Sequence, residues 1–113
     1  MKIIAESLTL KELSNMALNI FGNMVKAVVD VESGLLAVDA ELHSDLEALL
    51  LENGSKQKNL WGINLYPDME KNEFVEFDSL INIRPSQENR SRGVENEATR
   101  NKIIGIIEVR IKR

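Results

Sequence analysis

Two adjacent apolar segments, residues 24–31 and 35–43, constrain the fold most strongly, because their hydrophobic and polar side chains tend to alternate. The Ser33-Gly34 dipeptide between them is typical of a two-residue β-hairpin turn. With that turn, the alternation predicts an antiparallel hairpin with one definite register. The predicted cross-strand pairs are Val31 with Leu36, Val29 with Val38, Ala27 with Ala40, and Val25 with Leu42.

Three further segments are predicted to be strands. Residues 2–6 form a short one, and residues 60–66 form another that Pro67 ends. Residues 74–84 alternate over the longest stretch and predict the longest strand, paired antiparallel with residues 60–66.

Helices are predicted at both ends of the chain. Residues 8–21 carry a complete start signal, because Thr9 is a good N-cap residue and Glu12 completes a capping box. Gly22 is placed to end that helix. Residues 95–113 form the last helix, with Asn96 or Glu95 near its cap. Its predicted buried side is Ile103, Ile104, Ile107 and Ile111.

The sequence of residues 44–53 is consistent with two secondary structures. Ser44 and Glu47 have the spacing of a second capping box, which predicts a short helix. A strand entering an Asn53-Gly54 turn is the other interpretation.

These elements predict one α+β domain over residues 1–113, with two layers. A mostly antiparallel sheet of about five strands packs against the N- and C-terminal helices. The length suits a single core, and 43% hydrophobic with 28% charged residues is an ordinary globular mixture. An exposed sheet edge or face predicts a homo-oligomer, most simply a dimer.

The amino-acid composition excludes several kinds of catalytic and metal-binding site. The chain has no cysteine and one histidine, which excludes thiol catalysis and thiolate zinc sites, so neither a metal nor a cofactor is predicted. No apolar run has the length of a signal peptide or a transmembrane helix, which predicts a cytoplasmic protein without membrane contact. Residues 1–80 carry six Lys/Arg and fourteen Asp/Glu, whereas residues 81–113 carry eight and four. This acidic body with a basic end makes nucleic-acid binding unlikely.

The basic end contains the main candidate site, a loop at residues 84–93 that leads into the last helix. Arginine forks, hydroxyl and amide groups near a helix N-terminus suit a phosphate or carboxylate group. The predicted ligand-binding residues are Arg84, Ser86, Asn89, Arg90 and Arg92. In the alternative interpretation, Glu95 and Glu97 satisfy the helix end, and the arginines make only salt bridges within a structural homodimer.

A second candidate site comprises Asp39, Glu41 and His43, which would alternate along one face of the predicted strand 35–43. His43 with either carboxylate could serve a hydrolase-type enzyme as an acid and a base. Asn64 and Asn82 extend this candidate site, because asparagine inside a strand is disfavoured and indicates a polar pocket or a hydrogen bond to a loop.

Three stretches carry a resemblance to a known family. They are Leu-Trp-Gly-Ile-Asn-Leu-Tyr-Pro at residues 60–67, Ile-Asn-Ile-Arg-Pro-Ser-Gln with Asn-Arg-Ser-Arg at 81–92, and Val-Asp-Ala-Glu-Leu-His at 38–43. Together they resemble a small prokaryotic family of uncharacterised domains, over nearly the whole chain. The resemblance implies a stand-alone microbial protein and transfers no activity or catalytic residue.

Overall fold

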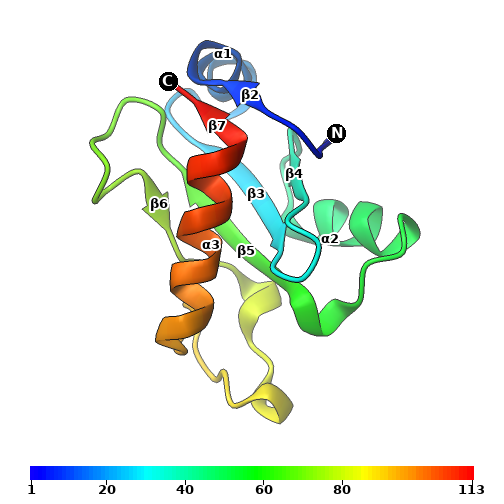
Figure 1. The fold of residues 1–113 in the computed structure, drawn as a ribbon. Coiled ribbons are helices and arrows are strands. Elements are labelled where there is room, and N and C mark those ends of the chain that lie inside the picture. Colours follow the sequence, from blue (N-terminus) through cyan, green and yellow to red (C-terminus); the bar gives the residue numbers. More distant parts are fainter.

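The computed structural model describes all residues, Met1–Arg113, and is built around one five-stranded antiparallel sheet (Figure 1). The order across the sheet is β1 (Lys2–Ile4), β4 (Leu36–Val38), β3 (Val25–Asp30), β5 (Leu60–Leu65) and β6 (Val75–Glu76). A separate parallel pair joins β2 (Leu8–Thr9) to β7 (Ile111–Lys112), so the two ends of the chain meet.

Helices cover both faces of this sheet. The larger core lies under α1 (Leu10–Ile20) and α3 (Glu97–Arg110), and a smaller core lies under α2 (His43–Glu52) on the other face. The predicted α+β class, the five antiparallel strands and the two terminal helices are confirmed. The helical alternative for residues 44–53 is also confirmed, and α2 adds a layer on the second face.

The caps predicted for the first and the last helix are present in the structure. The Thr9 side chain accepts a hydrogen bond from the Glu12 N–H and the reciprocal bond is present, which completes the capping box. Gly22 adopts the left-handed conformation, with φ +92°, and its N–H bonds to the Ala17 carbonyl at 2.6 Å. Asn96 caps α3, which ends at Arg110 rather than continuing as predicted, because the next residues form β7.

The predicted hairpin is present, but its register is wrong. Val29 faces Leu36 rather than Val38, a shift of two positions that leaves each side chain on the predicted face. The cause is the Asp30 carboxylate, which accepts hydrogen bonds from the N–H groups of Glu32 and Ser33 and enlarges the turn.

Strand β4 ends at Val38, so the predicted strand 35–43 is wrong beyond that residue. Asp39 turns the chain through a left-handed conformation with φ +74°, which aspartate tolerates better than most residues. Leu42 is then the N-cap of α2, and the capping box predicted at Ser44 is wrong.

The predicted long strand 74–84 is also wrong, because β6 stops after Glu76. Ser79 accepts a hydrogen bond from Ile81 N–H and starts a 3₁₀ turn. The Asn82 side chain then takes the place of a paired strand: its Oδ1 accepts from Gly62 N–H at 2.8 Å, and its Nδ2 donates to the Gly62 carbonyl at 2.9 Å.

Candidate functional site

Asn89 organises the 84–93 loop from within. Its side chain is 2% exposed and donates to the carbonyls of Asn82 and Gly93, each at 2.8 Å. Its Oδ1 accepts the Glu95 N–H at 2.8 Å. Asn89 therefore holds the loop together by bonds within the chain and has no unused polar atom to offer a ligand.

Arg84 ties the loop to the segment before β5. Its guanidinium donates to the Gln57 carbonyl and, at 2.6 Å, to the Leu60 carbonyl, and it lies 4.2 Å from the centre of the Trp61 ring. Burial lowers the pKa of Arg84, while the nearby Glu47 carboxylate opposes that shift. The donor groups of Arg84 are thus turned inward on the protein.

The other two arginines have separate surroundings. Arg92 donates through Nε to Asp78 at 2.6 Å in a surface ion pair. Arg90 and Ser86 are exposed, and their side chains make no hydrogen bond or ion pair. The three guanidinium groups therefore do not gather on one point, and Arg90 and Ser86 are the members of the predicted set left free to meet a ligand.

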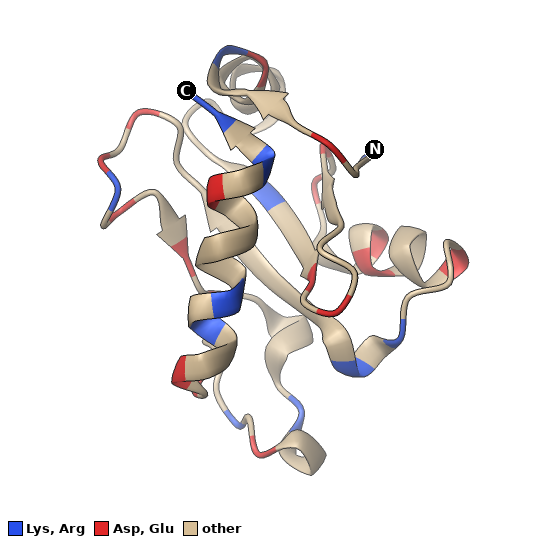
Figure 2. Cartoon of the chain, viewed as in Figure 1, with Lys and Arg blue, Asp and Glu red and all other residues tan.

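The Glu95 carboxylate binds two backbone N–H groups of this loop. Glu95 accepts from the N–H groups of Arg90 at 2.6 Å and Ser91 at 2.8 Å. These backbone bonds, first that of Ser91, lower the pKa of Glu95. Figure 2 shows Lys and Arg positions in this loop and in the segment before β5, at the same end of the molecule. The hollow of about 480 Å³ between the two segments is nevertheless faced by both Glu88 and Glu95, against one basic residue, Lys58.

The second candidate site does not assemble as predicted. His43 begins α2 and is 8% exposed, with Nε2 lying 2.8 Å from the Ile63 carbonyl, to which it donates. It makes no hydrogen bond to Asp39 or Glu41. Asp39 instead lies 3.9 Å from the Met1 amino group, and Glu41 is exposed. The pairing on which the hydrolase alternative depends is absent from the structure.

His43 is expected to make stability depend on pH. Burial lowers its pKa from the ordinary value of 6.5, although the bond to Ile63 opposes this. The unfolded chain then takes up the proton first as pH falls below that value, so the free energy of unfolding should decrease. Urea unfolding between pH 8 and pH 5 tests this, with His43→Gln as the non-titrating comparison. An equal pH slope in both proteins would contradict it.

The two strand-region asparagines have structural partners rather than a shared pocket. Asn64 donates to the Glu76 carboxylate at 2.8 Å, and Tyr66 donates to the same oxygen at 2.9 Å. The Asn82 side chain bonds to both the N–H and the carbonyl of Gly62 on strand β5. Cross-strand pairing of Asn64 with Glu76 could have been predicted only after β6 had been placed in register.

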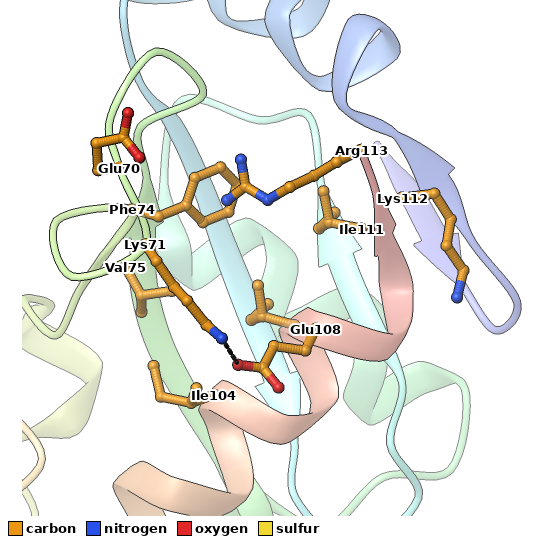
Figure 3. Close-up of a pocket in the computed structure, with 10 residues that line it drawn as sticks. Glu70, Lys71, Phe74, Val75, Ile104, Glu108, Ile111, Lys112 and Arg113 are labelled. Atoms are coloured by element: carbon orange, nitrogen blue, oxygen red, sulfur yellow. Dashed lines mark ion pairs between the residues drawn. The ribbon is translucent and has the colours of Figure 1, made fainter.

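Sequence reasoning missed a groove between α3 and the segment that enters β6 (Figure 3). This α3 groove has a volume of about 510 Å³. Its floor is apolar: Phe74, Val75, Ile104, Ile107 and Ile111. Its charged residues are Glu70, Lys71, Glu108, Lys112 and Arg113. The lining residues come from distant parts of the chain, so no single sequence motif predicts the groove.

Two charged contacts shape the α3 groove. Figure 3 shows Lys71 reaching across the floor to Glu108, with their charged atoms 3.5 Å apart. The Arg113 guanidinium lies 4.6 Å from the centre of the Phe74 ring and has no carboxylate within ion-pair distance. Lys112 points away from the other lining residues in the same view. Arg113 is therefore the free cation at this groove.

No three side chains of the types His, Asp and Glu are grouped so as to hold a metal ion. None of the helices combines the length and the apolar character needed to cross a bilayer.

Comparison with known proteins gives a family and no activity. No curated protein and no solved structure matches the chain. Residues 2–110 match the family described as "Protein of unknown function (DUF5674)". That match extends over nearly the whole domain, and it agrees with the resemblance seen in the sequence to an uncharacterised domain family. The chain thus belongs to the DUF5674 family of proteins of unknown function.

Proposed function

We propose that this protein is a binding module for a small amphipathic anion, with an apolar body and a carboxylate or phosphate head, and that the α3 groove holds it. The observation that carries the proposal is an apolar floor beside a guanidinium without an acidic partner. Ligand pockets commonly combine a mostly apolar lining with a few oriented polar groups.

The floor suits the apolar part of such a ligand. Val75 and Ile104 are only half-buried and offer apolar surface, with the buried Phe74 and Ile107 beneath them. The volume of about 510 Å³ lies within the range of roughly 300 to 1,000 Å³ that small-molecule pockets occupy. Covering this surface would remove apolar area from water, which favours binding.

The charges around the groove suit an anionic head. Lys71 and Glu108 offset each other as a pair. Lys112 points away from the groove, and Arg113 has no carboxylate within ion-pair distance, so the Arg113 guanidinium is the cation available to an anionic head. Stacking on Phe74 restrains the plane of that guanidinium, and a planar fork can bind a carboxylate through two parallel hydrogen bonds.

Decanoate is the probe that tests this proposal, with 1-decanol as its neutral counterpart and inorganic phosphate as an anion without an apolar body. Isothermal titration should show decanoate binding to the wild-type protein more tightly than either comparison compound. Arg113→Gln should weaken decanoate binding by about tenfold, as loss of one charged contact predicts. Ile104→Ser should weaken both decanoate and decanol, because it removes floor surface.

Arg90→Gln is the matched control, since it removes an exposed arginine that does not line the α3 groove and should leave decanoate binding unchanged. If decanoate fails to bind, or binds equally to wild type and Arg113→Gln, the groove proposal is wrong.

The 84–93 loop remains the second candidate for an anionic group, on the strength of the free side chains of Arg90 and Ser86. The phosphate arm of the same experiment tests it. Phosphate binding that disappears in the Arg90→Ala, Arg92→Ala double variant, while decanoate binding persists, would assign a simple anion to the loop.

A further inference from the structure

One acidic residue of the α3 groove, Glu108, competes with an anionic ligand for Lys71. We propose that Glu108 holds Lys71 when the α3 groove is empty, and that the anionic head of a ligand takes the place of Glu108 as the partner of Lys71. This inference rests on the proposed function, because it assigns a role within the same groove. Arg113 remains the main anchor of the head, and Lys71, whose side chain is exposed and free to turn, becomes a second partner when it leaves Glu108. Glu108 thereby sets the affinity and charge preference of the groove.

The position of the pair supports this role. Lys71 belongs to the segment between β5 and β6, whereas Glu108 belongs to α3, and their 3.5 Å contact joins the two walls of the groove (Figure 3). The pair stands beside Ile104 and Val75, the apolar side chains that a ligand body would cover. A ligand head that draws Lys71 to itself must share the ammonium group with Glu108 or take the place of Glu108, and sharing would bring two negative charges together around one cation.

The pair is also weak enough to be exchanged. The Lys71 side chain is 80% exposed and that of Glu108 is 54% exposed. Ion pairs at such exposed positions add little stability, because water and salt screen them and two long side chains must be ordered. A carboxylate or phosphate of the ligand can therefore replace Glu108 at small cost, and the ligand's burial of apolar surface adds the net gain.

Glu108 opposes an anionic ligand in two ways that experiment can separate. It occupies Lys71, and it places a negative charge near the incoming head. If occupation of Lys71 is the main effect, removing the Glu108 charge should help only while Lys71 is present. Repulsion alone would give the same benefit whether or not Lys71 is there.

A double-mutant cycle with decanoate tests the inference. Glu108→Gln should bind decanoate about two- to fivefold more tightly than wild type, as release of one exposed ion pair predicts. Lys71→Gln should bind it more weakly, and adding Glu108→Gln to Lys71→Gln should give no further gain. Decanol, which has no charge, should bind all four proteins alike.

Each other result has a definite meaning. A gain from Glu108→Gln that persists in the Lys71→Gln background, or no gain at all, would overturn the competition while leaving groove binding intact. Absence of decanoate binding in wild type and in every variant would overturn the proposed function and this inference with it.

Discussion

Asn82→Ala is expected to destabilise the protein by about 3 to 4 kcal/mol, since each buried polar group left unpaired costs about 1 to 3 kcal/mol. The Asn82 side chain is fully buried and satisfies both the N–H and the carbonyl of Gly62 on strand β5. It also donates to the Arg92 carbonyl at 2.9 Å, which anchors the end of the 84–93 loop. Alanine removes all three bonds. Strand β3 pairs with Gly62 on one side of β5, but no strand reaches Gly62 on the β6 side, so none can replace the lost bonds.

Urea unfolding followed by circular dichroism measures this loss as a lower midpoint at an unchanged slope. Asn72→Ala is the matched control, because Asn72 is exposed and its side chain makes no hydrogen bond, so its midpoint should stay close to that of wild type. A midpoint for Asn82→Ala close to that of Asn72→Ala would show that the Gly62 groups find other partners.

Asn82 also marks the boundary of what the sequence could predict about the fold. Two short-range signals were read correctly, the Thr9 cap and the strand that begins at Leu60, whereas the capping box at Ser44 was not. The alternation in residues 74–84 is equally regular, yet that segment leaves the sheet after Glu76. The deciding hydrogen bonds run from a side chain to a backbone 20 positions away, and periodicity carries no information about them.

The same limit applies to the hairpin. The Asp30 carboxylate binds two backbone N–H groups in the turn and, through its other oxygen, the Ser55 hydroxyl at 2.6 Å. Turn residues alone favoured Ser33-Gly34, whereas this buried carboxylate fixed a longer turn. The faces of both strands were still predictable, because a shift by two positions preserves the alternation.

For the candidate sites, residue types were more predictable than contacts. The 84–93 loop does concentrate polar side chains, but Arg84 is bound to carbonyls at residues 57 and 60, and Glu95 binds the loop backbone. The α3 groove depends on Phe74 and Arg113 meeting across 39 positions of sequence. Only the tertiary fold brings such residues together, so composition and spacing could not reveal the groove.

Gly62→Ala is expected to cost about 3 kcal/mol, at the upper end of the usual range for overpacking a buried position. A Cβ atom at Gly62 would lie 2.6 Å from both Cβ and Oγ of Ser79 and 3.1 Å from Cγ1 of Ile81. Ser79 is 1% exposed and starts the 3₁₀ turn that carries Asn82, so it cannot move aside without disturbing the bonds between Asn82 and Gly62.

A second substitution tests whether this contact is the cause. Ser79→Gly removes the two nearest of the three atoms that the new methyl group would meet. On its own it should destabilise the protein, because the hydrogen bond that starts the turn is lost. Combined with Gly62→Ala it should cost less than the sum of the two single changes, with a favourable coupling of about 1 to 2 kcal/mol in urea unfolding. Strict additivity would mean that the backbone of β5 relaxes away from Ser79, and that the close packing of this strand against the turn does not depend on glycine.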